Sequence, residues 1–194
     1  MSGLDPTRLS RRRLLALAGL CVVGRHAGAA EQPPTGWVNP RQGAPALPLQ
    51  CADGRQRTLL QLMGGRVTAV QLMFTGCNTS CPTQGALFAQ VAGLLPPVGL
   101  QLLSISIDAL GDNAQTLRQW QGRFGTFDSW VAGVPAVADV EPLAGFLRGV
   151  PASAGTHTAQ VFVFDRRARL VYRTGDAPRA SLVVALLDHV AGQG

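Results

Sequence analysis

Lysine is absent from this chain of 194 residues, in which all 17 basic residues are arginine. Together with the abundance of alanine and glycine, this absence indicates a bias in nucleotide composition rather than a binding surface. The first 30 residues hold five of the arginines and one of the 11 acidic residues, which leaves 12 basic and 10 acidic residues. Without a strong excess of positive charge in that remainder, we expect no nucleic acid partner.

A hydrophobic run long enough to cross a membrane is also missing from the N-terminus. The apolar run Leu14–Gly24 has 11 residues, whereas a spanning helix needs roughly 20. Arginines precede the run and the small residues 27–30 follow it, which is typical of an export signal. Residues 10–15 resemble the twin-arginine export motif, and the general secretory route stays open. We therefore expect residues 1–30 to be a signal peptide, with an uncleaved anchor or a lipid on Cys21 as alternatives.

Internal repeats and low-complexity segments are absent as well, so the rest of the chain is expected to form one domain. Residues 31–46 are rich in proline and glycine and have no periodicity. They are predicted to be an extended leader, either lying against the domain or loose in solution. The domain itself is predicted to span residues 47–194.

Strand and helix patterns alternate through this domain. The predicted strands are Leu47–Cys51 and Thr58–Leu60 as a hairpin, Val67–Phe74, Leu100–Ile107, and Ala159–Phe164 with Leu170–Arg173 as a second hairpin. The predicted helices are Thr83–Leu95, Asn113–Phe124, Val140–Leu147 and Ala180–Ala191. A strand-helix-strand order requires a parallel pair, and a hairpin requires an antiparallel one. The sequence therefore predicts a mixed sheet flanked by helices, which is the layout of thioredoxin-like α/β folds.

Cysteine is scarce, and two of the four cysteines, Cys77 and Cys81, lie between a predicted strand and a predicted helix. Residues four apart share one face of a helix, so both sulfurs can meet one ion or each other. Thiols near a helix N-terminus also ionise more easily. The pair fits a reversible disulfide, a soft-metal site or two buried cysteines.

Histidine is scarcer still, and His157 directly precedes the predicted strand Ala159–Phe164. In a thioredoxin-like layout, the loop that enters this strand packs beside the cysteine loop. Two thiolates and one imidazole favour copper, whereas zinc usually wants four ligands and the sequence offers no obvious fourth nearby. Zinc stays open as the second choice of metal. A histidine in a surface loop is the alternative.

Three motifs appear in a family-specific order. They are Cys77-Asn78-Thr79-Ser80-Cys81-Pro82, Ser106-Ile107-Asp108 with Asp112, and Thr156-His157-Thr158 followed by residues 161–165. In these motifs the chain resembles the Sco/SenC family, thioredoxin-like copper proteins that assist assembly of cytochrome c oxidase. The resemblance implies that Cys77, Cys81 and His157 bind copper and that Asp108 lies near them. Ala109 departs from the family, which usually has proline there, and so do residues 75–76 and 78–79.

The resemblance implies a copper chaperone that assists copper insertion into the dicopper centre of cytochrome c oxidase. Its expected partner is the copper subunit of the oxidase or another periplasmic cuproprotein, and its expected location is the periplasm of a bacterium. A protein that keeps its signal would stay at the inner membrane. The alternative function is that of a thiol-disulfide oxidoreductase using Cys77 and Cys81, supplied by a thioredoxin-like reductant. In the first case the protein is not an enzyme.

Overall fold

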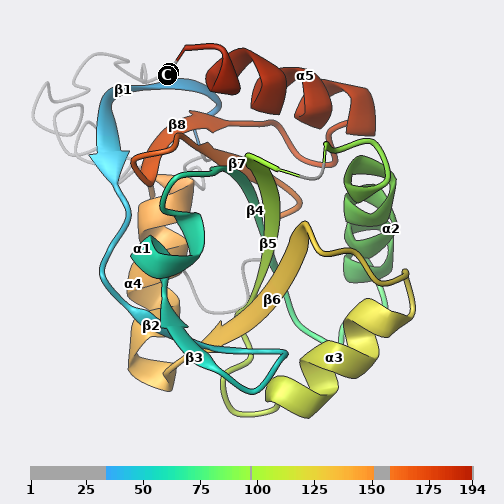
Figure 1. Ribbon diagram of the computed structural model, residues 1–194. Helices are drawn as coiled ribbons and strands as arrows, with labels where there is room; N and C mark the ends of the chain where they lie inside the picture. The colour runs from blue at the N-terminus through green and yellow to red at the C-terminus, as the bar shows by residue number, and fades with distance from the viewer. Residues whose placement is uncertain (1–33, 97, 151–157, 194) are drawn as a thin grey trace, which may run out of the picture. The chain divides into compact units, whose positions relative to one another are not determined.

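The computed structural model describes residues 34–96, 98–150 and 158–193. Within these residues, an eight-stranded sheet runs through the centre of the domain in the order β1-β8-β7-β4-β5-β6-β2-β3 (Figure 1). The strands are β1 (Gly36–Gly43), β2 (Pro48–Cys51), β3 (Gln56–Thr58), β4 (Val67–Met73), β5 (Leu100–Ser106), β6 (Trp130–Pro135), β7 (Val161–Phe164) and β8 (Arg169–Arg173). Strands β4, β5 and β6 are parallel, and the other neighbouring pairs are antiparallel. The predicted mixed sheet is confirmed.

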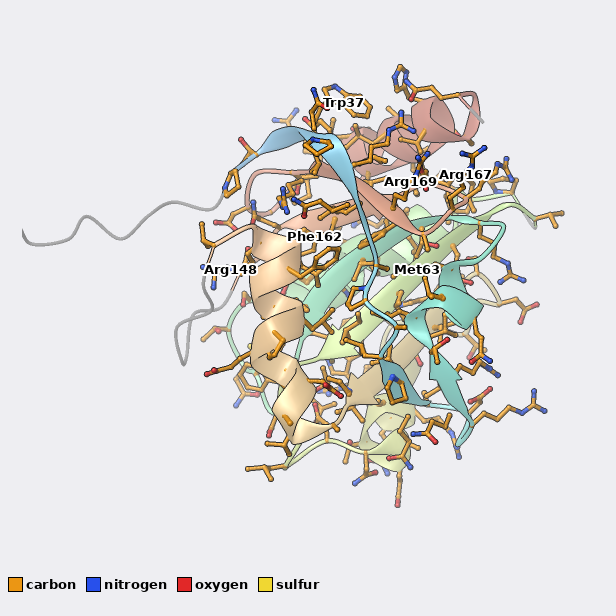
Figure 2. The ribbon with its side chains drawn as sticks, turned by 90° about the vertical axis from the view of Figure 1, so that its left-hand side faces the viewer. Trp37, Met63, Arg148, Phe162, Arg167 and Arg169 are labelled. Atoms are coloured by element: carbon orange, nitrogen blue, oxygen red, sulfur yellow. The ribbon has the colours of Figure 1, made fainter. Side chains whose placement is uncertain are left out.

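Helices cover both faces of the sheet. Helices α2 (Cys81–Ala92), α3 (Ala114–Gly122) and α5 (Ala180–Ala191) pack on one face, and α1 (Leu59–Met63) and α4 (Val137–Arg148) pack on the other. Central strand β4 is buried on both sides, because Ala69 and Met73 face the first group while Val70 and Leu72 face the second. Figure 2 shows Phe162 of β7 in the second layer, between the sheet and α4.

Two strands are absent from the sequence prediction. Strand β6 completes the parallel part of the sheet, and β1 lies within the segment expected to be an extended leader. That leader is an edge strand, whose ends Gly36–Trp37 and Gln42–Gly43 pair with β8. The irregular stretch between these two pairings contains Pro40, which edge strands and bulges tolerate. The predicted helices and the second hairpin are present, with ends shifted by a few residues. In the first hairpin the predicted strand Thr58–Leu60 is wrong beyond Thr58, because Leu59 and Leu60 begin α1, a short helix that Thr58 caps and that the sequence did not predict.

Helix α2 lies close to the loop after α3 because Gly85 has no side chain. A Cβ atom at this position would overlap the ring of Phe124. Phe124 packs in turn against Trp120 with ring centroids 5.0 Å apart, and both rings contact Trp130 of β6. This aromatic cluster fixes α2, and with it the N-terminal turn that carries Cys81, against the sheet.

Candidate functional site

The loop between β4 and α2 carries two cysteines, and the buried carboxylate of Asp112 holds its first residues in place. Asp112 accepts hydrogen bonds from the backbone N–H of Thr75 at 3.0 Å and from the Thr75 hydroxyl. The Ser106 hydroxyl, at the end of β5, donates to the same carboxylate at 2.6 Å. Asn113 caps α3 with its own side chain, and the Asp112 carboxylate accepts only a long hydrogen bond from this helix, from the Thr116 hydroxyl at 3.5 Å.

Cys77 has a sulfur atom surrounded by hydrogen-bond donors. The backbone N–H of Cys81 lies 3.4 Å from this sulfur, the Thr79 hydroxyl 3.5 Å and the Ser80 hydroxyl 4.0 Å. Burial by itself raises the pKa of Cys77, but hydrogen bonds from Thr79 and Cys81 outweigh burial and lower the pKa to about 6. Cys77 is therefore mostly a thiolate at neutral pH.

Cys81 is the first residue of α2 and is completely buried. Burial raises its pKa, and the hydrogen bond to the Cys77 sulfur raises it further, to about 12. Neither cysteine forms a disulfide in this structure, and their sulfurs lie in hydrogen-bond contact, as their spacing predicts. One acidic and one weakly acidic thiol thus stand together, which suits both soft-metal binding and disulfide exchange.

Asp108, the first carboxylate of its motif, forms its hydrogen bonds within residues 106–111. Its carboxylate accepts the N–H of Gly111 at 2.9 Å, and its own N–H donates to the Ser106 hydroxyl at 3.1 Å. Within the described parts of the chain, no hydrogen bond joins Asp108 to the cysteine loop. Asp112, four residues further on, is the carboxylate that reaches this loop.

His157 lies outside the described residues, so its prediction as a ligand stays a prediction. The described chain resumes at Thr158, whose carbonyl oxygen accepts a hydrogen bond from Gln84 Nε2 at 3.3 Å. Gln84 lies three residues after Cys81 on α2, so the residue that follows His157 is bound about one helical turn from Cys81. The Thr158 hydroxyl also donates to Asp176 at 3.1 Å, which fixes this residue a second time.

Gln84 and Asp112 contribute to the site in ways that the sequence did not predict. Asp112 was expected only as part of a motif. For Gln84, the sequence offers only its position on the Cys81 face of the helix, which many core residues share. Among the residues that the structure describes, no group of three His, Cys, Asp or Glu side chains is close enough to hold a metal ion.

The other soft or titratable candidates lie elsewhere. Met63 and Met73 are fully buried core residues. Cys51 belongs to the hydrophobic layer on the opposite face of the sheet from Cys77 and Cys81. His189 lies near the end of α5, where its ring packs 5.4 Å from that of Trp37. None of these four residues was predicted as a metal ligand.

In the part of the chain that the structure describes, no helix is both long enough and apolar enough to span a membrane. The predicted export signal, residues 1–30, and Cys21 within it lie outside the described residues.

Comparison with known proteins gives one family. The family model named SCO1/SenC matches residues 49–191 of this chain. No curated protein matches the chain in sequence.

Solved structures of low sequence identity share the fold. A SCO1/SenC family lipoprotein from Bacillus anthracis is 16% identical with a TM-score of 0.69, over 79% of this chain and 99% of that one. BsSco, described as a Sco-family cytochrome c oxidase assembly protein with a disulfide switch, is 16% identical with a TM-score of 0.68, over 79% and 96% of the chains. ScoI of Bradyrhizobium japonicum, solved with copper bound, is 19% identical with a TM-score of 0.63, over 76% and 99% of the chains. These likenesses show a thioredoxin-like α/β fold.

Proposed function

The chain belongs to the SCO1/SenC family, and from this premise we propose that it is an exported copper chaperone, with Cys77, Cys81 and His157 as copper ligands. Copper is the cargo, held as Cu(I) and passed by ligand exchange to the dicopper centre of cytochrome c oxidase or to another periplasmic cuproprotein. The observation that carries the proposal is the contact between two thiols at the start of α2, one of which is already acidic.

The chemistry of the two sulfurs supports copper. Thiolates are soft ligands that select Cu(I), and the lowered pKa of Cys77 supplies one thiolate without a competing proton. Cys81 must lose its proton when the metal binds, because its pKa is about 12 in the metal-free protein. Binding at pH 7 is therefore expected to release about one proton per copper ion.

The bond between Gln84 and Thr158 supports the choice of His157 as the third ligand. This bond holds the backbone directly after His157 beside the helix that begins with Cys81. An imidazole suits copper in either oxidation state, and three ligands are enough for Cu(I). The copper-bound ScoI of Bradyrhizobium japonicum shows that a protein of this fold can hold copper.

The test is a Cu(I) titration of the reduced protein against a competing chelator, with Cys77→Ser, Cys81→Ser and His157→Ala in parallel. We expect one-to-one binding, loss of tight binding in both cysteine variants, and affinity at least about tenfold weaker in His157→Ala. His189→Ala is the matched control, because His189 lies on α5 near Trp37 and is expected to leave affinity unchanged. Wild-type affinity in His157→Ala would exclude the histidine from the site.

Thiol-disulfide exchange is the second candidate function, and the separation of the two pKa values favours it. The Cys77 thiolate would attack a partner disulfide, form a mixed disulfide and release one partner sulfur as a thiolate. Cys81 would then lose its proton and attack the Cys77 sulfur, which releases the second partner thiolate and leaves the Cys77–Cys81 disulfide. The partner gains two electrons, and a thioredoxin-like reductant must return two electrons to this protein.

Replacement of His157 distinguishes the two candidate functions. Exchange needs only the two sulfurs, so His157→Ala should leave the rate of partner reduction near the wild-type value while Cys77→Ser abolishes it. If His157→Ala and Cys77→Ser reduce that rate equally, a purely redox function is excluded.

A further inference from the structure

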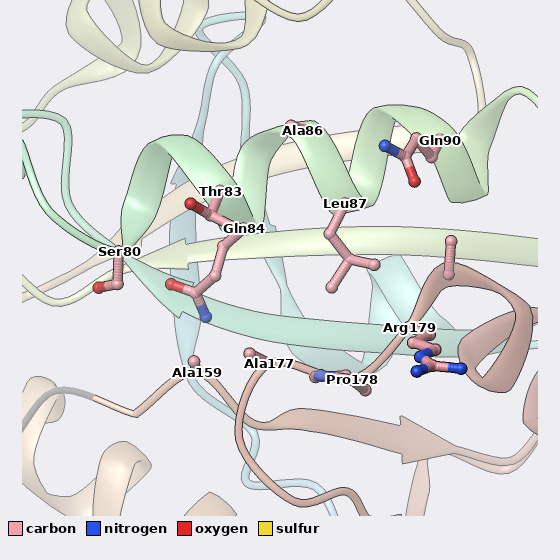
Figure 3. Close-up of a pocket in the computed structure, with 11 residues that line it drawn as sticks. Ser80, Thr83, Gln84, Ala86, Leu87, Gln90, Ala159, Ala177, Pro178 and Arg179 are labelled. Carbon is pink, nitrogen blue, oxygen red and sulfur yellow. The ribbon is translucent and has the colours of Figure 1, made fainter.

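A pocket of about 470 Å³ opens beside the cysteine loop, between α2 and the segment that enters α5 (Figure 3). Helix α2 contributes Gln84 and Leu87, and the opposite wall contains Ala177 and Pro178. One end of the pocket is lined by Ser80, whose hydroxyl lies 4.0 Å from the Cys77 sulfur. The pocket therefore ends beside Cys77, with Ser80 between the pocket and the Cys77 sulfur.

Gln84 presents an unused hydrogen-bond acceptor to the pocket. Its side chain is only 3% exposed, and its Nε2 is engaged with the Thr158 carbonyl. Its Oε1 has no hydrogen-bond partner among the described residues. In Figure 3 the amide extends away from α2, with its nitrogen toward Ala159 and its oxygen toward the Ser80 side of the pocket. A buried acceptor without a donor is unfavourable, so a ligand that donates an N–H group to Gln84 Oε1 should bind more tightly than one that does not.

Arg179 provides a positive charge at the other end of the pocket. Figure 3 shows it at the opposite end from Ser80. Its side chain is exposed and forms no ion pair within the described part of the chain. Arginine pairs well with carboxylates, so this end favours an acidic group on the ligand.

The wall formed by residues 177–180 has a fixed and unusual conformation. Ala177 has a φ of 48°, a left-handed conformation that is unfavourable for a residue with a side chain. The hydrogen bond from the Ala177 N–H to the Ala159 carbonyl, at 3.1 Å, holds it there. Strained backbone of this kind is often found at binding sites, and a preformed wall reduces the entropy lost on binding.

The length of the pocket sets the length of the ligand. Ser80 and Gln90 both line it, and ten residues of helix span roughly 15 Å. An extended chain advances about 3.3 Å per residue, so roughly four or five residues fit along α2. The pocket thus offers an N–H acceptor near its Ser80 end, apolar contacts from Leu87 and Pro178, and a cation at its far end.

We propose that this pocket binds an extended segment of the partner protein, which places a cysteine at Cys77 and an acidic side chain about four residues away at Arg179. The inference rests on the proposed function, in which Cys77 exchanges a ligand or a disulfide with a partner cysteine. Gln84 Oε1 accepts a backbone N–H of the segment, and an apolar side chain lies against Leu87 and Pro178. The pocket thereby selects which cysteines reach Cys77.

The test compares two pentapeptides that carry the cysteine at one end and glutamate or lysine at the other, with glycine and leucine between them. The peptide cysteine is activated as a mixed disulfide with nitrothiobenzoate. The Cys77 thiolate attacks the peptide sulfur, so a Cys77–peptide disulfide forms and coloured nitrothiobenzoate leaves as a thiolate. The rate of nitrothiobenzoate release is measured on the reduced full-length protein without copper at low salt. Each rate is divided by the rate for a reference peptide that has the same activated cysteine and glycine at all other positions.

We expect the glutamate peptide to react about three to five times faster than the lysine peptide, a ratio typical of one exposed ion pair. Arg179→Gln should abolish this preference, and Arg179→Glu should reverse it. The control Arg55→Gln, which removes an exposed arginine in the β2–β3 turn, should retain it. A wild-type protein that does not discriminate, or a preference that persists in Arg179→Gln, would overturn the proposal.

A second measurement addresses Gln84 without altering the protein. Methylation of each peptide nitrogen in turn removes one N–H group, and one position should slow the reaction several-fold. Equal rates for all methylated peptides would overturn the assignment of Gln84 as the acceptor. The assays contain no copper, so a protein that fails to bind copper can still show the peptide preference. Conversely, a copper-binding protein without the preference contradicts only the pocket assignment.

Discussion

Strand β4 connects two ends of the domain that use carboxylates in different ways. Beyond its amino end, Asp165 binds Arg41 of β1 at 3.3 Å and Arg169 of β8 at 2.8 Å. Figure 2 shows Arg167 and Arg169 together at the β7–β8 turn. Beyond its carboxyl end, Asp112 forms no ion pair in the described residues and instead accepts hydrogen bonds from uncharged donors in the cysteine loop and in β5.

The difference shows how one sheet separates stability from chemistry. At the amino end, charged groups satisfy one another and join the edge strand β1 to the β7–β8 hairpin. At the carboxyl end, a carboxylate holds the loop that carries the two sulfurs. Ligand sites of open α/β sheets usually lie at the carboxyl ends of parallel strands, and β4 and β5 follow this rule.

The largest expected effect is a difference in reactivity between the thiols. At pH 7, iodoacetamide should modify Cys77 in the folded, metal-free protein orders of magnitude faster than Cys81 or Cys51, because burial raises the pKa of both of these thiols. The Cys77 rate should fall about tenfold per pH unit below a pKa of about 6. Peptide mapping by mass spectrometry measures each site, and unfolded protein provides the control in which the sites react alike. Equal rates for Cys77 and Cys81 in the folded protein would contradict the assignment.

The same pKa of Cys77 has a consequence for stability. A thiol whose pKa is lowered on folding stabilises the folded state fully above its unfolded pKa, and this contribution is lost as the pH falls through about 6. Cys77→Ser should therefore lose less stability at pH 5 than at pH 8.

The next largest effect separates the two ends of β4. Asp112→Ala should lower the free energy of unfolding by about 3 kcal/mol, because it removes the acceptor of several buried hydrogen bonds. It should also weaken Cu(I) binding at least about tenfold, because the loop is no longer held. The matched variant Asp165→Ala should lose about 1–2 kcal/mol and keep its copper affinity. Urea unfolding measures the free energy of unfolding, and chelator competition measures the Cu(I) affinity. Equal loss of copper affinity in both variants would contradict the different roles assigned to Asp112 and Asp165.

A smaller effect is expected in acid. Burial by itself raises the pKa of Asp165, but hydrogen bonds from Arg169 and the turn outweigh it and lower the pKa. Its contribution is therefore present above the unfolded pKa of about 3.9 and lost as the pH falls below that value. The difference in unfolding free energy between wild type and Asp165→Asn should shrink between pH 5 and pH 2. A difference that stays constant over this range would contradict the lowered pKa.

The smallest effect is expected for Arg167→Gln. The Arg167 side chain is exposed and forms no ion pair in the described residues. Its replacement should change the unfolding free energy by less than about 0.5 kcal/mol. Copper affinity should be unchanged. A clear loss of copper affinity would show that the β7–β8 turn, at the amino end of β4, influences the cysteine loop at its carboxyl end.

The sequence predicts the buried elements well and the edge poorly. Strands β4 and β5 are mostly apolar, and α5 has a regular apolar stripe, so local pattern suffices for them. Strand β6 contains Gly133 and ends at Pro135, which weaken the strand signal. Strand β1 is specified by pairing with β8 and by the edge contact of Trp37 with Tyr172, contacts that no local pattern contains.

The same distinction applies to the site. The contact between Cys77 and Cys81 follows from their spacing at a strand-helix junction, which the sequence displays. The bracing of Thr75 by Asp112 joins residues 37 apart, and the bond from Gln84 to Thr158 joins residues 74 apart. Such contacts depend on how the elements pack, so a single sequence does not display them.

The close packing of Gly85 against Phe124 has an evolutionary consequence. Any larger residue at position 85 would overlap the Phe124 ring, so neither position can change freely while the other stays as it is. Relatives with alanine or serine at position 85 should therefore carry a smaller side chain at position 124. This pair should covary, and ancestral sequences should show the two replacements arising together.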